Sequence, residues 1–298
     1  MDKLGLGSVA SGRVESLAYR RLPVDLSKVR YAYGPDSFRR PEVARGETVA
    51  IDLPESSVFP GTRRRVWVHV SAGIDPALPS PFIVFQDGWL NLNPDGEVRA
   101  GIVVDNLVHA GEIPPLVGVF VDPGVFPDVE DLDARKNRNA EYDAFNDRYA
   151  TFITTEVLPL VNQRLALSDN STDAAITGGS SGGNCAFTAA WMRPDRFGKV
   201  AGFLSSFVQV GDHLPDGNPY PDLITSAPRR PLRVFLQAGH CDLNWDQPTR
   251  NWLAENLKVA AALAQGGYDF RFVLTDTGHV MHTAGVLLPD ALRWLWRD

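Results

Sequence analysis

From about residue 47 onward, the chain alternates short apolar runs with longer stretches in which apolar residues recur every three or four positions. The short runs are rich in Val, Ile, Phe and Leu, which is typical of strands. They lie at residues 47–53, 66–70, 81–85, 116–121, 175–177, 200–206, 232–237 and 270–274. Helical spacing occurs at residues 98–107, 149–161, 185–191, 249–265 and 287–297. Strands that alternate with helices predict an α/β fold, in which helices cover both faces of a mostly parallel, twisted sheet.

The segments outside this pattern predict how the chain is organised. Residues 1–45 contain prolines and scattered charges without periodicity, so we expect an amino-terminal extension over the surface of one α/β domain at residues 46–298. Residues 122–143 and 211–230 are polar and contain several prolines. Both are longer than ordinary connections, and we expect two loops over the same edge of the sheet, the first of which could be a lid or a substrate loop.

A glycine-rich stretch joins the strand at residues 175–177 to the helix at residues 185–191, and it reads GGSSGGN at residues 178–184. A serine between glycines at such a junction predicts a tight elbow, where only small neighbours fit around an exposed hydroxyl. The N–H of the next residue, at the start of the helix, can stabilise a developing oxyanion. A flexible linker has a similar composition but does not connect a strand directly to a helix. We therefore predict a nucleophilic serine at this elbow.

Two serines fit the elbow motif, and their neighbours differ in size. With Ser180 as the nucleophile, the crowded positions around it are occupied by Gly178, Gly182 and Gly183. With Ser181 as the nucleophile, the bulkier Asn184 occupies one of those positions. We favour Ser180 because small residues fit a tight elbow better.

A serine hydroxyl needs a general base, and the base needs a carboxylate that fixes its tautomer. In this type of sheet the expected chain order is serine, acid, histidine. His279 follows the last predicted strand and is the favoured base, with His282 as the alternative. Asp242 follows the preceding strand and is the favoured acid, with Asp246 in reserve; Asp276 lies too close to the histidine in the chain.

The strand at residues 81–85 ends abruptly in Gln86-Asp87-Gly88-Trp89. Loops at the carboxyl ends of parallel strands carry the functional sites of such sheets. We therefore expect backbone N–H groups of Trp89 and Ser181 to form an oxyanion hole. A simple turn at Asp87 is the alternative interpretation of the same residues.

Charged and aromatic residues of the stretch at 122–143 are candidates for substrate binding, because loops over a rigid scaffold collect binding residues. A surface charge cluster that pairs with itself is the alternative interpretation. The candidate substrate-binding residues are Arg138, Glu141 and Tyr142, together with Asp87.

Net charge and cysteine content limit the possible partners and the compartment. The formal net charge of -7 argues against nucleic acid as a partner, and no apolar run approaches the roughly 20 residues that span a bilayer. The amino terminus lacks the apolar segment of a signal peptide, and Cys185 and Cys241 cannot form a disulfide framework, so we expect a cytoplasmic protein. His240, Asp242, His279 and His282 match no dense metal-ligand motif, and we expect neither a metal nor a cofactor.

Taken together, these residues resemble the esterase D and enterochelin esterase-like branch of the α/β hydrolases. The resemblance covers about residues 47–298, and it is carried by FPGT at 59–62, FQDG at 85–88, Arg138, Glu141, Tyr142, the elbow, GYDFRF at 267–272 and PDALRWLWR at 289–297. It implies an α/β-hydrolase fold in which Ser180 is the nucleophile, His279 the base and Asp242 the acid.

Residues and resemblance together predict a serine hydrolase that cleaves a small-molecule carboxylic ester through an acyl-enzyme on Ser180. A siderophore, lactone or sugar-linked ester is the expected kind of substrate. Acyl transfer through the same intermediate is one alternative, and a binding module without catalytic activity is another.

Overall fold

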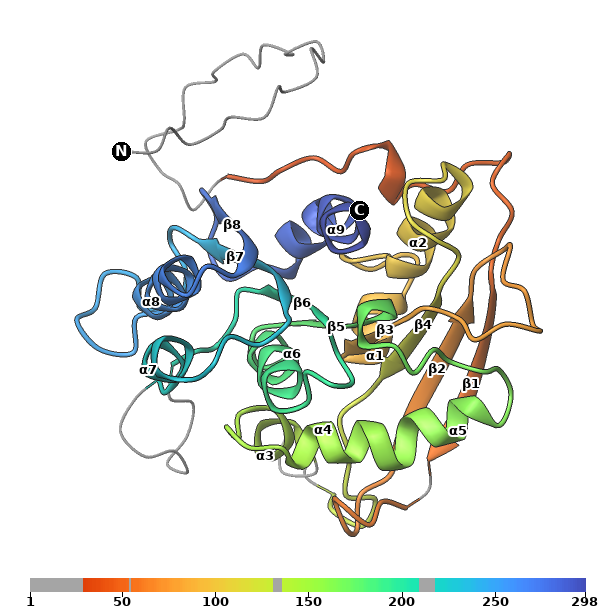
Figure 1. The fold of residues 1–298 in the computed structure, drawn as a ribbon, viewed down its shortest axis with the longest axis horizontal. Coiled ribbons are helices and arrows are strands. Elements are labelled where there is room, and N and C mark those ends of the chain that lie inside the picture. The colour runs from red at the N-terminus through yellow and green to blue at the C-terminus, as the bar shows by residue number, and fades with distance from the viewer. Residues whose placement is uncertain (1–28, 54, 131–135, 209–217) are drawn as a thin grey trace.

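The computed structural model describes residues 29–53, 55–130, 136–208 and 218–298 (Figure 1). Among these residues, eight strands form one sheet in the order β1-β2-β4-β3-β5-β6-β7-β8. The strands are β1 (Glu47–Leu53), β2 (Arg64–Val70), β3 (Phe82–Gln86), β4 (Val117–Val121), β5 (Ala174–Gly179), β6 (Lys199–Phe203), β7 (Arg233–Gly239) and β8 (Asp269–Thr275). Each strand predicted from the sequence is present, with ends that differ by a few residues.

The direction of the strands places one edge of the sheet at the expected site. β2 pairs antiparallel with β1 and with β4, whereas the neighbouring pairs from β4 to β8 are parallel. The predicted mostly parallel sheet is therefore confirmed. Because the carboxyl ends of β3, β5, β7 and β8 share one edge, the loops that follow these strands lie close together.

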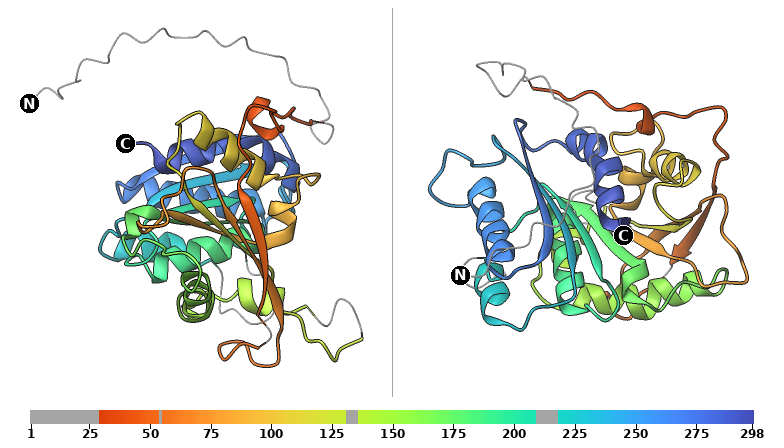
Figure 2. Two further views of the ribbon diagram at one scale, coloured as in Figure 1. Left: turned by 90° about the vertical axis from the view of Figure 1, so that its right-hand side faces the viewer. Right: turned by 45° about the horizontal axis from the view of Figure 1, so that its top comes forward.

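Helices cover both faces of the sheet, as predicted (Figures 1 and 2). α2 and α9 pack on one face, and the other face carries α6, α8 and the α4–α5 segment. A π-helical turn joins α4 to α5. The helical elements are η2 (Pro35–Ser37), α1 (Gly88–Leu92), α2 (Ala100–His109), α3 (Arg138–Tyr142), α4 (Arg148–Phe152), η3 (Ile153–Val157), α5 (Leu158–Asn162), η4 (Ser171–Asp173), α6 (Ser181–Met192), α7 (Tyr220–Ser226), α8 (Trp252–Gln265) and α9 (Met281–Trp296).

The core consists of one apolar cluster on each face of the sheet. Strands β3, β4, β5 and β6 are buried over their whole lengths, as expected of central strands between two helix layers. On the α2 and α9 face, the rings of Phe85 and Phe120 stack with their centroids 4.5 Å apart. On the opposite face, Phe187 of α6 packs edge-on against Tyr220 at 4.9 Å. Both faces of the sheet are therefore covered by packed apolar side chains.

Part of the expected amino-terminal extension, residues 29–45, lies across α2 and α9. The Asn106 side-chain amide of α2 donates to the carbonyl oxygens of Asp36 and Phe38, each at 2.8 Å. Arg293 of α9 forms an ion pair with Asp36 at 2.7 Å. Residues 1–28 of the expected extension lie outside the described residues.

Several helices differ from the sequence-based prediction, and the short helices α1 and α3 lie in stretches that were expected to be loops. The expected loop at residues 211–230 contains α7, so this part of the prediction was wrong; residues 211–217 lie outside the described part. Pro221 suits the first turn of a helix, and the buried Tyr220 hydroxyl donates to Thr188 of α6, which anchors that turn in the core. α9 begins at Met281, earlier than predicted, and continues through Pro289. Across the described residues, no helix is both long and apolar enough to span a membrane.

Candidate active site

The strand-to-helix elbow has the geometry that its glycines predict. β5 ends at Gly179, α6 begins at Ser181, and Ser180 between them has φ 57° and ψ -127°. A positive φ is unfavourable for a residue with a side chain, so surrounding contacts must hold it. The Ser180 N–H donates to the Phe203 carbonyl at 2.8 Å. A Cβ on Gly178 would lie 2.5 Å from the Gly182 carbonyl oxygen, which explains why this position requires glycine.

The three side chains that the sequence singled out lie in one chain of contacts. His279 Nδ1 is 2.6 Å from Asp242 Oδ1, and His279 Nε2 is 3.0 Å from Ser180 Oγ. Asp242 is only 1% exposed, and its Oδ1 also accepts the Leu243 N–H at 2.7 Å. Because an ionised carboxylate can only accept, Nδ1 carries the imidazole proton and Nε2 accepts the Ser180 hydroxyl proton. The Trp252 ring packs edge-on against the imidazole, with the ring centroids 5.9 Å apart.

The alternative residues that the sequence left open lie elsewhere. The Ser181 hydroxyl donates to Asp143 at 3.1 Å and is turned away from the imidazole. His282 Nε2 donates to the Tyr31 carbonyl at 2.8 Å, in the amino-terminal segment. Asp246 accepts from Gln247 at 3.2 Å on the surface. In the described part of the chain, no three His, Cys, Asp or Glu side chains are grouped so that they could hold a metal ion.

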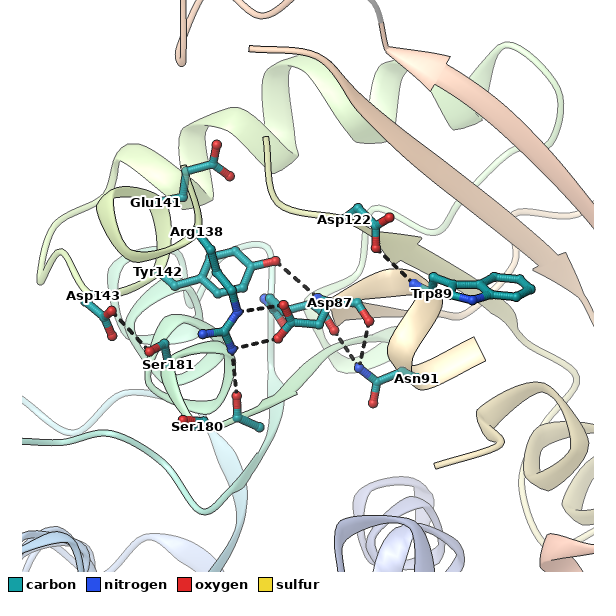
Figure 3. A network of polar contacts seen from close by, with 12 residues as sticks. Asp87, Trp89, Asn91, Asp122, Arg138, Glu141, Tyr142, Asp143, Ser180 and Ser181 are labelled. Atoms are coloured by element: carbon teal, nitrogen blue, oxygen red, sulfur yellow. Dashed lines mark hydrogen bonds and ion pairs between the residues drawn. The ribbon is translucent and has the colours of Figure 1, made fainter. Parts of the chain in front are cut away.

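The two expected oxyanion donors differ in their availability. The Ser181 N–H opens α6 and has no hydrogen-bond partner among the described residues. The Trp89 N–H, in contrast, donates to Asp122 Oδ1 at 3.0 Å, so it is not free in this structure (Figure 3). Burial raises the pKa of the Asp122 carboxyl to about 6. Of the two expected donors, the Ser181 N–H therefore has no partner among the described residues, and Asp122 accepts the Trp89 N–H.

Arg138 and Asp87 form a tight pair beside the elbow. Two guanidinium nitrogens of Arg138 donate to the two Asp87 oxygens at 2.7 and 2.8 Å (Figure 3). Asp87 has a left-handed backbone with φ 52°, and its N–H donates to the buried Tyr142 hydroxyl at 3.1 Å. A bidentate pair of this kind fixes geometry as well as charge. Arg138, Asp87 and Tyr142 thus hold the loop after β3 against the elbow.

Glu141, a substrate-binding candidate in the sequence, is buried and pairs within the protein. Its carboxylate is fully buried in a bidentate pair with Arg64 of β2, at 2.7 and 3.0 Å. The Gly124 N–H and the Asn137 side-chain amide also donate to it. Glu141 therefore anchors α3 to the sheet.

Two further carboxylates at the site were missed in the sequence. Asp122 directly follows β4 at the carboxyl edge of the sheet, and that position could have revealed it. Asp143 follows α3, is 5% exposed, and accepts hydrogen bonds from the Ser181 and Ser206 hydroxyls at 3.1 and 3.2 Å. Burial raises the pKa of the Asp143 carboxyl to about 6. No sequence pattern distinguishes Asp143 from the other polar residues of its stretch.

Comparisons with known proteins agree with this architecture. A family model named Esterase, described as "Putative esterase", matches residues 57–283. Over 210 residues the chain is 27% identical to the iron(III) enterobactin esterase of Escherichia coli (strain K12), and the match covers 69% of this chain and 46% of that protein. The chain thus spans about half the length of the curated relative that it matches.

Solved structures of two kinds of esterase share the fold. The enterobactin esterase of Shigella flexneri superimposes with a TM-score of 0.68 at 22% identity, covering 91% of this chain and 64% of that one. A CE1 ferulic acid esterase from Anaeromyces mucronatus, in complex with ferulic acid, gives a TM-score of 0.67 at 15% identity and covers 92% and 97%. The family match extends over most of the chain, and the resemblance seen in the sequence is confirmed at the level of family and fold: this chain belongs to the Esterase family and has an α/β-hydrolase fold.

Proposed function

We propose that this chain is a serine hydrolase that cleaves small-molecule carboxylic esters through an acyl-enzyme on Ser180. The observation that carries the proposal is the contact chain from Ser180 Oγ to His279 at 3.0 Å and from His279 to Asp242 at 2.6 Å, placed at a strained elbow. Membership of the Esterase family supports the same reaction class. A nucleophile, a base and an orienting carboxylate are the parts that acyl transfer from an ester requires.

In the proposed first step, Ser180 Oγ attacks the ester carbonyl while His279 Nε2 takes its proton. Asp242 keeps the proton on Nδ1 and stabilises the imidazolium that forms. The imidazolium then protonates the leaving alkoxide, and the acyl group stays on Ser180. In the second step, His279 activates a water molecule that releases the acid product and restores the serine.

The oxyanion that forms in each step needs donors that are already in place. The free Ser181 N–H, at the positive end of α6, is the first donor in this proposal. The Trp89 N–H becomes the second donor when its hydrogen bond to Asp122 opens. An ionised Asp122 beside the oxyanion would oppose catalysis, and its raised pKa lowers the cost of keeping it neutral.

Exposed apolar side chains near the site favour an ester with an apolar or aromatic part. Leu243 and Trp245, each 46% exposed, follow the acid Asp242, and Trp89 and Leu90 are exposed on the loop after β3. The relatives are named as an iron(III) enterobactin esterase and a CE1 ferulic acid esterase. Esters that carry an aromatic or apolar group are therefore the first substrates to test, among siderophore, lactone and sugar-linked esters.

Hydrolysis of p-nitrophenyl esters tests the reaction class. The wild-type chain is expected to release p-nitrophenol from acetyl, butyryl and benzoyl esters, and Ser180→Ala to lose at least about 10³-fold in kcat. Ser181→Ala is the matched control, because it removes the neighbouring hydroxyl but keeps the backbone amide; it should retain measurable turnover. Equal turnover by wild type and Ser180→Ala would refute the proposal. Addition of an alcohol during the assay separates hydrolysis from acyl transfer, because transfer yields a new ester.

A further inference from the structure

A buried carboxylate that the proposed reaction does not use lies directly beside the elbow. Asp143 follows the last residue of α3, and its two oxygens accept two different hydroxyls. Oδ2 accepts from Ser181 at 3.1 Å, and Oδ1 accepts from Ser206 at 3.2 Å (Figure 3 shows the Ser181 contact). The residue is 5% exposed, so these are its main polar contacts with the protein.

The two serines held by Asp143 flank the nucleophile on both sides. Ser181 follows Ser180 in the chain and supplies the free backbone N–H at the start of α6. Ser206 lies in the loop after β6, and its N–H donates to the Ser180 carbonyl oxygen at 3.1 Å. The Asp143 carboxylate therefore connects Ser181, which follows the nucleophile, with Ser206, which binds the backbone of Ser180.

A strained residue keeps its conformation only when the surrounding structure over-determines it. Ser180 has φ 57° and ψ -127°, outside the regions that a serine ordinarily occupies. Its N–H donates to Phe203 at the end of β6, and its carbonyl accepts from Ser206 in the loop that follows. Asp143 adds a side-chain contact to that same loop and to α6, and thus ties the two elements that meet at Ser180.

Burial makes the ionised form of Asp143 unfavourable. Desolvation raises the pKa of this carboxyl to about 6, against the lowering effects of the two serine hydroxyls and of Arg138, while the nearby Asp87 raises it further. A carboxylate that is perturbed in this way beside a reactive group is typical of a functional site. A purely structural contact between two hydroxyls would not need an ionisable side chain.

We propose that Asp143 is a positioning residue that braces the elbow, and this inference rests on the proposed function. By holding the Ser181 hydroxyl, Asp143 turns that side chain away from His279 and keeps the Ser181 N–H directed at the oxyanion. By holding the Ser206 hydroxyl, it fixes the loop that binds the Ser180 backbone. Asp143 touches neither the substrate nor the reacting atoms.

Kinetics of a small set of variants tests the brace. Asp143→Ala is expected to lower kcat on the order of 10- to 100-fold with little change in KM, because small displacements of a nucleophile are costly. Asp143→Asn should recover part of the loss, since the amide oxygen can still accept one hydroxyl. Asp173→Ala is the matched control: it removes a carboxylate that accepts the Ser168 hydroxyl at 2.8 Å, at the opposite end of β5. It should leave kcat unchanged.

A mutant cycle identifies the path through which Asp143 acts. In the Ser181→Ala/Ser206→Ala background both hydroxyl partners are absent, so adding Asp143→Ala should lower kcat by at most a few-fold more. An equal loss of kcat in wild type and in the serine double variant, or an effect mainly on KM, would overturn the proposed role of Asp143. The serine double variant alone must show reduced kcat, and it tests the proposal even when Asp143→Ala does not fold.

Hydrogen exchange separates a failure of the brace from a failure of the proposed function. Backbone amides of residues 180–184 should exchange faster in Asp143→Ala than in wild type and Asp173→Ala, whether or not the chain hydrolyses esters. Unchanged hydrogen exchange at the elbow would overturn the proposed role of Asp143. Absence of ester turnover in wild type, combined with faster exchange in the variant, would instead overturn the proposed function.

Discussion

At the scale of single residues, the elbow depends on what each glycine touches. A Cβ on Gly178 would meet the backbone of Gly182, which cannot move without displacing α6. A Cβ on Gly179 would clash with the end of the Met281 side chain, Sδ and Cε, and would lie at ordinary contact distance from the Phe203 carbonyl oxygen. A flexible thioether can give way, whereas a helix backbone cannot. The two glycines are therefore required for different reasons, although they are identical in the motif.

This difference predicts a rescue. Gly179→Ala should destabilise the fold by about 1–3 kcal/mol through overpacking and reduce ester turnover. Met281→Ala in the same chain should restore most of the loss, because it removes the atoms that clash. Gly178→Ala should not be rescued by Met281→Ala. Urea unfolding and turnover of a p-nitrophenyl ester measure both effects, and a failure of rescue at position 179 would contradict the assigned contact.

The raised pKa of Asp143 predicts how its replacement changes stability with pH. The carboxyl has a pKa of about 6 in the folded chain, above its ordinary value of 3.8, so the folded state binds this proton more tightly than the unfolded state. The stability that this proton contributes is present below about pH 4 and is lost as the pH rises to about 6. An asparagine at this position does not titrate, so Asp143→Asn does not lose stability as the pH rises. Its stability relative to wild type should therefore rise across this window, by up to about 3 kcal/mol.

Unfolding by urea at pH 4 and at pH 8 measures this difference. Arg138 and Asp87 are the charged groups that act on Asp143, and neither is altered by the substitution. The same stability difference at both pH values would show that the Asp143 proton is not held more tightly in the folded chain. If Asp143 positions the elbow, Asp143→Asn should gain stability and lose turnover. If its contacts were merely structural, the substitution should lower both stability and turnover.

At the scale of elements, the short helix α3 shows where sequence reasoning about the site reaches its limit. Arg138 and Glu141 are three residues apart on one helical turn, yet Arg138 binds Asp87 at the elbow and Glu141 binds Arg64 in the core. A five-residue helix has no apolar periodicity from which a face could be predicted. The stretch could be recognised as a binding loop, but its side chains could not be sorted into core and site.

The assignment of Glu141 to the core leads to a prediction about stability. Glu141→Leu leaves the Arg64 guanidinium buried without its carboxylate and should destabilise the fold by about 3–5 kcal/mol. Arg64→Met/Glu141→Leu removes both charges and should recover much of that loss. Chemical denaturation measures the stability, and kcat/KM of the folded protein measures the site. A loss of kcat/KM in Glu141→Leu without any loss of stability would instead support the substrate contact suggested by the sequence.

At the scale of the whole molecule, the sequence predicted the sheet better than the segments that lie over it. Periods of two and of three to four residues follow from burial on a strand or a helix, so the eight strands and the long helices α6 and α8 could be predicted locally. The order of serine, acid and histidine along the chain follows from the same topology. The partner of the Trp89 amide, by contrast, is Asp122 in the loop after the neighbouring strand β4, and no local pattern around Trp89 reveals this contact.

The packing of the amino-terminal segment depends on contacts far apart in the chain. The Tyr31 hydroxyl donates to the Asp276 carboxylate at 3.3 Å, and the Tyr33 ring packs against His282 at 4.5 Å. These contacts explain why His282 is unavailable as a base, although its place in the sequence allowed that role. A long-range interaction of a segment without periodicity cannot be predicted from composition, since prolines and scattered charges are equally compatible with a free extension.

Fluorophosphonate labelling followed by peptide mapping shows directly whether Ser180 is the activated nucleophile. A fluorophosphonate reacts with a serine that a neighbouring base has activated, and the adduct remains on that residue. We expect a single adduct on Ser180, none in Ser180→Ala and much slower labelling in His279→Ala. An intact fold without any adduct on Ser180, or an adduct on Ser181 instead, would show that Ser180 is not the activated nucleophile.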